Sequence, residues 1–246
     1  MVSLESEIIF SVFGAKITNT IIATIFVDAI LIFLTFYIKR NISVIPGKIQ
    51  NMAEALIAYF YDLTKQIAEK YTSVIFPWFA SFFIFIFAAN IMALLPGFGT
   101  LGFFHVIDGH KEFVPVLRGA TSDFNTTLAL ATVSLGATHI LAIKYNGIIG
   151  YIKKFVSFNP ILLFVGILEL VSEFTKLISL SFRLFGNIYA GEVVLVTISS
   201  LAAFIAPIPF LLLESIVALV QALVFAMLTM VFMSILIKPH HAEGGE

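Results

Sequence analysis

The fold of this chain is decided by its longest apolar stretch, residues 160–207, which reads PILLFVGILELVSEFTKLISLSFRLFGNIYAGEVVLVTISSLAAFIAP. As one helix, the stretch would be about 70 Å long, more than twice the roughly 30 Å hydrocarbon core of a bilayer. Either the stretch is one strongly tilted helix, or Phe185-Gly186-Asn187 forms a turn between two conventional spans. Periodicity alone leaves both alternatives open.

A polar stripe runs along this stretch. On a helix, the polar residues that fall within about 80° of one another are Glu169, Glu173, Lys176, Arg183 and Asn187. Glu192 lies about 180° from Arg183 on the same helix. An Arg near the centre of a bilayer costs between about 3 and well over 10 kcal/mol, so its presence there indicates a function. Arg183 is therefore the leading candidate for a functional residue.

The composition of the whole chain points to a membrane protein. Its 246 residues are 60% apolar and only 12% charged, and the mean hydropathy is +1.05, which excludes an ordinary soluble enzyme. The formal net charge of -1 provides no basic surface for nucleic acid. Because the chain has no Cys, disulfides and thiolate metal sites are excluded. We expect no cofactor and no metal site.

Apolar segments of membrane-spanning length predict an all-α, multi-span protein with about five transmembrane helices and a single membrane domain over residues 1–246. The expected spans are residues 18–38, 77–95, 123–143, 160–205 and 208–237. Residues 46–70 alternate apolar and charged positions at helical spacing, which predicts an amphipathic helix on the membrane surface. Asp28 lies halfway along the first span, and we expect it to contact a partner or a water-filled pocket.

The distribution of Lys and Arg orients these spans. If residues 160–237 form two spans, most of the basic residues fall on one side and only Lys16, Lys111 and Arg118 fall on the other, which places the N-terminus outside and the C-terminus inside. Three spans in this stretch would leave Lys238 outside, which the charge distribution disfavours. The orientation assigns depths to the polar residues. The outer group is Glu192, Glu214, Asp123 and Asn125, with Gln221 two turns deeper than Glu214, and the inner group is Glu169 and Glu173.

Two groups of carboxylates at different depths, separated by a permanent cation, suit a pair of offset half-channels. Carboxylates exchange protons with water, whereas Arg does not deprotonate in proteins. Arg183 would then be a barrier rather than a relay. Gly186 and Ala190 would let a partner helix approach closely beside it.

The run SLSFRLFGNIYAGE, residues 179–192, resembles the signature of the a subunit of F-type ATP synthases. The similarity extends to Pro46-Gly47-Lys48, to Asn90 before Leu94-Leu95-Pro96, to SDFNTTL at residues 122–128, to Glu169 and to Gln221. The resemblance favours a long tilted hairpin formed by the last two helices over a turn at Gly186.

By this resemblance, Arg183 is the essential Arg that faces a carboxylate on a rotating c-subunit ring. Glu169 would belong to the inner path, and Asn187 lies beside the Arg. The outer path would be lined by Glu192, Glu214, Gln221, Asp123 and Asn125. The implied partners are the c-ring, the b subunits of the peripheral stalk, indirectly the F1 sector, and the lipid bilayer. The chain would have no ATP site of its own.

The resemblance leaves the transported ion open between H⁺ and Na⁺, and it does not cover Asp28, Glu173 or Lys176. The N-terminus favours a bacterial plasma membrane over the mitochondrial inner membrane. The alternative function is a stand-alone, proton-coupled secondary transporter. For individual residues, the structural alternatives are a carboxyl pair for Glu192 and Glu214, a helix contact for Gln221, and a neutralising pair for Glu173 and Lys176.

Overall fold

The computed structural model describes residues 7–12, 15–95, 98, 102–107, 110–155, 159–201 and 205–238. Its helices are α1 (Asn19–Arg40), α2 (Lys48–Ala68), α3 (Thr72–Leu94), α4 (Phe124–Phe155), α5 (Pro160–Leu201) and α6 (Pro207–Ile237), with short 3-10 turns at η1 (Glu69–Tyr71) and η2 (Ala120–Ser122). Its strands are β1 (Ile8–Val12), β2 (Ala15–Thr18), β4 (Gly102–Ile107) and β5 (His110–Pro115).

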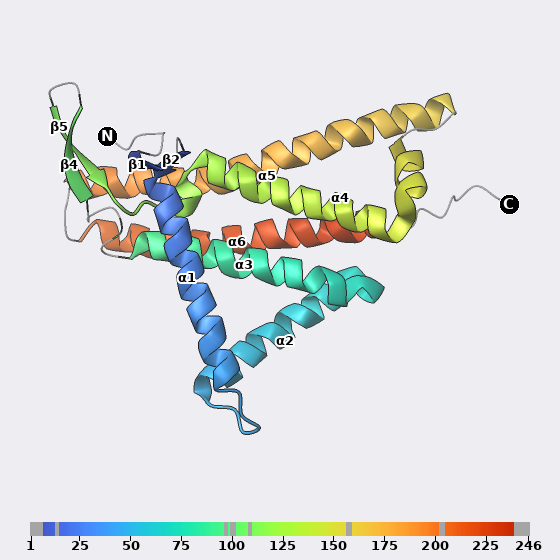
Figure 1. Ribbon diagram of the computed structural model, residues 1–246, viewed down its shortest axis with the longest axis horizontal. Coiled ribbons are helices and arrows are strands. Elements are labelled where there is room, and N and C mark those ends of the chain that lie inside the picture. Colours follow the sequence, from blue (N-terminus) through green and yellow to red (C-terminus); the bar gives the residue numbers. More distant parts are fainter. Residues whose placement is uncertain are drawn as a thin grey trace.

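Four helices, α3 to α6, lie lengthwise beside one another, and α1 crosses them steeply (Figure 1). Helix α2 runs from the far end of α1 back to the beginning of α3. The most extensive helix contacts join α3 to α6 and α4 to α5. Both β-hairpins lie at one end of the four helices, which we call the hairpin end, and the α4–α5 connection lies at the opposite end.

Helix α5 resolves the ambiguity of the long stretch, because residues 160–201 form one helix that includes Phe185, Gly186 and Asn187. The helix begins where the sequence offers a cap, since the backbone N–H of Ile161 donates to Asn159 Oδ1 at 3.1 Å. Leu180, Leu184 and Ile188 are buried, and their spacing of four continues across Gly186. An unbroken buried face therefore stabilises the helix at the position where a turn was the alternative.

The apolar core lies between α3 and α6. Its largest side chains on α3 are Ile75, Phe79 and Ile86, and α6 faces them with small residues, Ala222 and Ala226. The small side chains let the two helices approach closely, as is common in membrane helix packing.

Helix α2 has the one-sided character expected of a surface helix. Only Phe60, Thr64 and Ala68 are buried, against α3 and α6, whereas Ile49 and Met52 in its first half are 57% and 79% exposed. An exposed apolar face of this kind is typical of a helix lying on a membrane.

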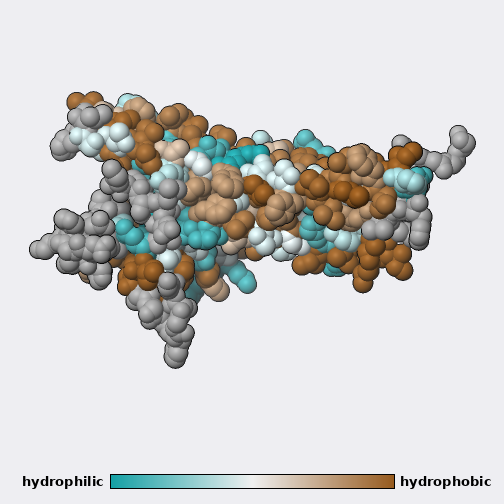
Figure 2. All heavy atoms as spheres, turned by 90° about the horizontal axis from the view of Figure 1, so that it is seen from above, coloured by the Kyte–Doolittle hydropathy of each residue, from teal (hydrophilic) through white to brown (hydrophobic). Residues whose placement is uncertain are grey.

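Within the described residues, four segments are long and apolar enough to cross a membrane: Asn19–Arg40, Lys48–Leu94, Phe124–Ile152 and Pro207–Ile237. Helix α5, with 42 residues, is long enough to cross a membrane but is not among these four segments. Apolar side chains cover much of the described surface in Figure 2, including the end formed by the first half of α5, where Ile161, Phe164 and Leu168 are exposed. The prediction of an all-α, multi-span membrane protein is confirmed.

Two small features differ from the sequence-based expectation. The sequence predicts helices alone, but the connection after α3 contains the antiparallel hairpin β4–β5, in which Phe104 pairs with Phe113. Helix α4 extends beyond residue 143 and is broken at Gly147, which has a positive φ of 72° that favours glycine. The part of α4 after Gly147 turns back toward α5 (Figure 1), and Gly166 leaves room for the carbonyl group of Phe155.

Candidate functional site: two polar clusters on either side of Arg183

Arg183 lies on an exposed face of α5. Its guanidinium Nη2 donates to Ser179 Oγ at 3.2 Å, and its carbonyl accepts from Asn187 Nδ2 at 2.9 Å. Gly186 and Ala190 are exposed on the same side. In the part of the chain that the structure describes, no acidic side chain forms an ion pair with Arg183. The guanidinium is therefore positioned from its own helix and remains available to a partner.

A cavity of about 300 Å³ lies at the hairpin end, between α3, α5 and α6. Glu192 from α5, Glu214 from α6 and Arg118 from the segment after β5 all line this cavity. Arg118 Nε lies 3.6 Å from Glu192 Oε1, and the side chains of Arg118 and Glu192 are 6% and 33% exposed. This hairpin-end cavity therefore holds two carboxylates and one buried guanidinium.

Gly191 makes the close approach of α5 and α6 possible at this cavity. A Cβ atom at Gly191 would collide with both carboxylate oxygens of Glu214. Glu214 is only 8% exposed, so its carboxyl group is fixed against the backbone of α5. The sequence neighbours Gly191 and Glu192 thus bring together two carboxylates that are far apart in the chain.

The wall of the cavity is braced by buried amide and hydroxyl groups. Thr121 and Asn90 are joined by a hydrogen bond from the Thr121 hydroxyl to Asn90 Oδ1, at 2.5 Å. Asn90 Nδ2 in turn donates to the carbonyl of Ala218 on α6, at 3.4 Å. Asn90 is 2% exposed, so this bridge between α3, η2 and α6 lies inside the protein.

Asp123 and Asn125 do not line the hairpin-end cavity. Asp123 accepts from the Thr20 hydroxyl at 2.9 Å and from the backbone N–H of Asn125 at 2.8 Å. These contacts place Asp123 at the N-terminus of α4, where a carboxylate satisfies backbone N–H groups. The side chain of Asn125 is exposed.

Gln221 lies on α6, two helical turns after Glu214. It is half-buried and surrounds a small hollow together with Arg183, Leu180, Leu184 and Phe225. The amide of Gln221 and the guanidinium of Arg183 therefore share one site where α5 meets α6.

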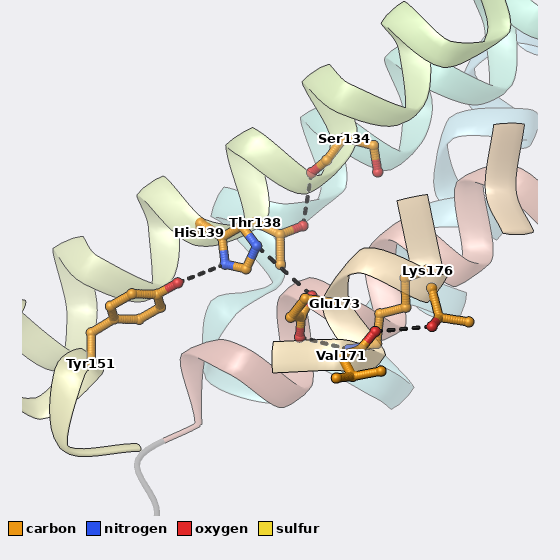
Figure 3. A network of polar contacts seen from close by, with 8 residues as sticks. Ser134, Thr138, His139, Tyr151, Val171, Glu173 and Lys176 are labelled. Atoms are coloured by element: carbon orange, nitrogen blue, oxygen red, sulfur yellow. Dashed lines mark hydrogen bonds and ion pairs between the residues drawn. The ribbon is translucent and has the colours of Figure 1, made fainter. Parts of the chain in front are cut away.

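A second polar cluster lies on the other side of Arg183, between α4 and α5 (Figure 3). Lys176 Nζ donates to Glu173 Oε1 at 2.8 Å, and His139 Nε2 lies 3.8 Å from Glu173 Oε2. The other ring nitrogen, Nδ1, is hydrogen-bonded to the Tyr151 hydroxyl at 3.0 Å. Glu173 is 9% exposed, and Glu169, one turn before it, is half-buried. The ammonium group of Lys176 also lies over the ring of Phe232, 4.8 Å from its centre.

Sequence reasoning missed the residues that act across helices. Arg118 was counted only as an outer loop charge, and His139 and Tyr151 were not connected to Glu173. One feature of the sequence could have drawn attention to Arg118. It lies five residues before Asp123, which is at the start of a predicted helix. Asp28, in contrast, is exposed on α1 and lines neither the hairpin-end cavity nor the hollow beside Gln221.

Comparison with known proteins agrees with this arrangement. Residues 20–234 match the family model described as ATP synthase A chain. This match covers the six long helices and all of the polar residues discussed above.

Curated relatives carry the same description. ATP synthase subunit a of Desulfotalea psychrophila is 36% identical over 216 residues, which are 84% of this chain and 79% of the relative. ATP synthase subunit a 3 of Pelobacter propionicus is 33% identical over 208 residues, 83% of this chain and 81% of the relative. ATP synthase subunit a 1 of Hahella chejuensis is 30% identical over 219 residues, 89% of this chain and 84% of the relative. The chain therefore belongs to the ATP synthase A chain family, whose members are the a subunits of the membrane-embedded Fo sector.

Proposed function

We propose that this chain provides two half-channels and the essential arginine that couple proton flow across a membrane to rotation of a c-subunit ring. One observation carries the proposal. Arg183 is exposed and pairs with no acidic group in the described part of the chain, while two half-buried carboxylates, Glu169 and Glu192, lie on either side of it along α5. A permanent cation between two proton-exchanging regions prevents protons from passing directly from one region to the other.

The exposed face around Arg183 suits a helical partner. Gly186 has no atom within 4 Å of the position that a Cβ would take, and Ala190 is exposed one turn further along. Small residues at this spacing let a second helix pack closely in a membrane. A carboxylate on a c subunit could therefore approach the guanidinium directly.

The coupling follows from charge. A ring carboxylate beside Arg183 is favoured in its ionised form, whereas crossing the lipid phase requires the protonated form because a bare charge is costly there. The carboxylate must then gain a proton on one side of Arg183 and lose it on the other. The hairpin-end cavity with Glu192 and Glu214 would supply the outer route, with Gln221 leading toward Arg183, and Glu169 would belong to the inner route. Asn187 would help to hold the backbone beside Arg183.

Membership of this family implies Fo partners such as the c-ring and the b subunits, and a multi-pass membrane location. We infer that α1, α3, α4, α5 and α6 cross a bacterial plasma membrane, that α2 lies on its inner surface, and that the F1 sector is contacted only indirectly. The transported ion is proposed to be H⁺, with Na⁺ as the alternative to be tested. The bacterial sources of the relatives quoted above support this location.

The decisive test is ATP-driven acidification of inverted membrane vesicles that contain the whole complex. Arg183→Ala should abolish acidification while the amount of assembled complex stays close to that of the wild type. Arg40→Ala, at the exposed end of α1, is the matched control and should pump normally. Normal pumping by Arg183→Ala would refute the barrier role. Sodium-stimulated transport without acidification would reassign the ion, and proton transport by the purified chain alone would favour a secondary transporter.

A further inference from the structure

Glu173 is the buried carboxylate that the proposed half-channels do not use. It is 9% exposed, and its Oε2 makes no hydrogen bond. The charged and titratable groups that face it are His139 and Tyr151 from α4 and Lys176 and Glu169 from α5. Helix α6 contributes only the apolar ring of Phe232 beside Lys176. A carboxylate removed from water to this degree needs such partners, because an isolated buried charge is strongly unfavourable.

Glu173 and Lys176 stand between two hollows. On one side, Glu173, His139 and Tyr151 line a cavity of about 620 Å³ between α4 and α5. On the other side, Lys176, Ser179 and Arg183 line a hollow of about 360 Å³. The hydrogen bond of 2.8 Å between Lys176 and Glu173 connects the two walls. A proton held by Glu173 would thus be within one side-chain movement of either hollow.

His139 has the geometry of a proton carrier toward Glu173. Its Nδ1 is engaged by the Tyr151 hydroxyl, and its Nε2 faces Glu173 at 3.8 Å, too long for a hydrogen bond but within range of a small ring movement. Histidine is the side chain that changes charge between about pH 5 and 8. Figure 3 shows the imidazole lying between the phenol of Tyr151 and the carboxylate of Glu173.

The backbone of α4 is bent in a way that completes this cluster. The break at Gly147, with φ of 72°, turns the last part of α4 back, so that Tyr151 lies beside His139 although the two are 12 residues apart. An uninterrupted helix would carry Tyr151 about 18 Å further along its axis. The positive φ at Gly147 is therefore linked to the position of the phenol group.

We propose that Glu173 and His139 form the proton-exchanging group of the inner route, positioned by Tyr151 and Lys176. This inference rests on the proposed function, which it deepens by naming the inner-side residues. During synthesis, the Glu173 carboxylate accepts a proton that a ring carboxylate has released beside Arg183. It passes that proton to the free nitrogen of neutral His139, and the resulting imidazolium releases one proton to water in the larger cavity. The steps run in reverse during ATP-driven pumping, and no electrons are exchanged.

The side-specific pH dependence of transport tests this proposal. In inverted vesicles the inner face of the protein is turned to the medium, so the pH of the medium and the pH of the lumen are set separately. Glu173→Gln should slow ATP-driven acidification by about a hundredfold, the low end of what a positioned acid or base contributes, and Glu173→Asp should restore part of the rate. His139→Gln should remove the dependence on medium pH between about 5 and 8 and leave the dependence on lumen pH unchanged.

Matched controls separate this role from a structural one. Glu54→Gln removes an exposed carboxylate on α2 that bonds only to Gln50 among the contacts described, and it should leave both pH dependences unchanged. Tyr151→Phe keeps the ring that packs on Phe155 at 5.1 Å but removes the hydroxyl group, and it should shift the dependence on medium pH. If Glu173→Gln fails to assemble, His139→Gln and Tyr151→Phe still carry the test.

The outcomes distinguish this inference from the proposed function. If Arg183→Ala abolishes pumping while His139→Gln and Tyr151→Phe keep the wild-type response to medium pH, the inner-route assignment is overturned and the half-channel proposal stands. If these two variants alter the response to lumen pH instead, the cluster lies on the wrong side. If Arg183→Ala pumps normally, the half-channel proposal itself fails.

Discussion

The two polar clusters on either side of Arg183 differ in the groups that surround their carboxylates. At the hairpin end, two carboxylates from two helices, Glu192 and Glu214, share a cavity with one guanidinium, that of Arg118. At the opposite end, a single buried carboxylate, Glu173, faces a lysine and a histidine. The hairpin-end cavity therefore has more acidic than basic side chains. At the opposite end, the carboxylate of Glu173 lies directly beside a lysine and a histidine, so a proton can be passed from one side chain to another.

Among the variants that test this difference between the two clusters, Gly191→Ala is expected to have the largest effect on pumping. Its new methyl group would collide with the Glu214 carboxylate and displace it, so pumping should fall roughly a hundredfold if the carboxylate acts in proton transfer. Acidification of inverted vesicles, normalised to assembled complex, measures this. Gly150→Ala is the control, because its Cβ would meet only the side chain of Asn146 at an ordinary 3.8 Å. Equal rates for the two variants would separate Glu214 from the outer route.

Replacing one acid of the pair tests whether the hairpin-end cavity stores a proton. Glu192→Gln and Glu214→Gln should each slow pumping by about tenfold and alter its dependence on lumen pH, which reports the outer side in inverted vesicles. Glu54→Gln again serves as the reference. Unchanged pH profiles in both variants would remove the two carboxylates from the proton path.

Removing the guanidinium should affect the same cavity differently. Arg118→Gln leaves Glu192 without its cation at 3.6 Å, so we expect a shifted dependence on lumen pH and somewhat less assembled complex, because the half-buried carboxylate loses its nearest positive charge. Arg118→Lys should recover assembly better than the pH profile, because Lys keeps the charge but lacks the planar guanidinium. A wild-type profile in Arg118→Gln would show that Glu192 does not depend on Arg118.

At the opposite end, Gly147→Ala should have a moderate effect. An alanine at φ of 72° is strained by about 1 to 2 kcal/mol, and relief of that strain would move Tyr151 away from His139. We expect the rate of acidification to respond several-fold less to medium pH, about as in Tyr151→Phe. Its dependence on lumen pH should be unchanged. Full retention of the medium response would mean that the kink does not position the phenol.

The smallest effect is expected outside the two clusters, at the contact between Lys238 and Glu69. Their side chains meet at 2.9 Å, and the hydrogen bond and charge of Lys238 lower the pKa of the exposed Glu69 carboxyl below its usual value. A lowered pKa in the folded state means that the contact stabilises above the ordinary pKa and is lost as pH falls through the lowered one. Lys238→Ala should therefore change the thermal midpoint slightly at neutral pH and not at all in strong acid.

The sequence predicts those features of this molecule that follow from the residue pattern within a single helix. Arg183 stands out because a charge in an apolar stretch is costly, and the stripe along α5 follows from helical spacing alone. Contacts between helices depend on packing, so the pairing of Arg118 with Glu192 and of His139 with Glu173 had no signal in the spacing. Asp123 illustrates the same limit. The membrane depth expected from the sequence grouped it with the outer carboxylates, although its hydrogen bonds are with Thr20 and with the start of α4.

The continuity of α5 has a mechanical consequence. Arg183 and both flanking carboxylates are carried on one unbroken helix of 42 residues, in which Glu173 and Glu192 lie about 28 Å apart along the axis. A rotating c-ring would exert a lateral force on the helix that carries the arginine facing its carboxylates. Two helices joined by a turn would absorb that force by bending at the turn. In the proposed function, a single unbroken helix that contacts α4 and α6 would instead act as a stator and keep the two proposed half-channels at a fixed angular offset from each other.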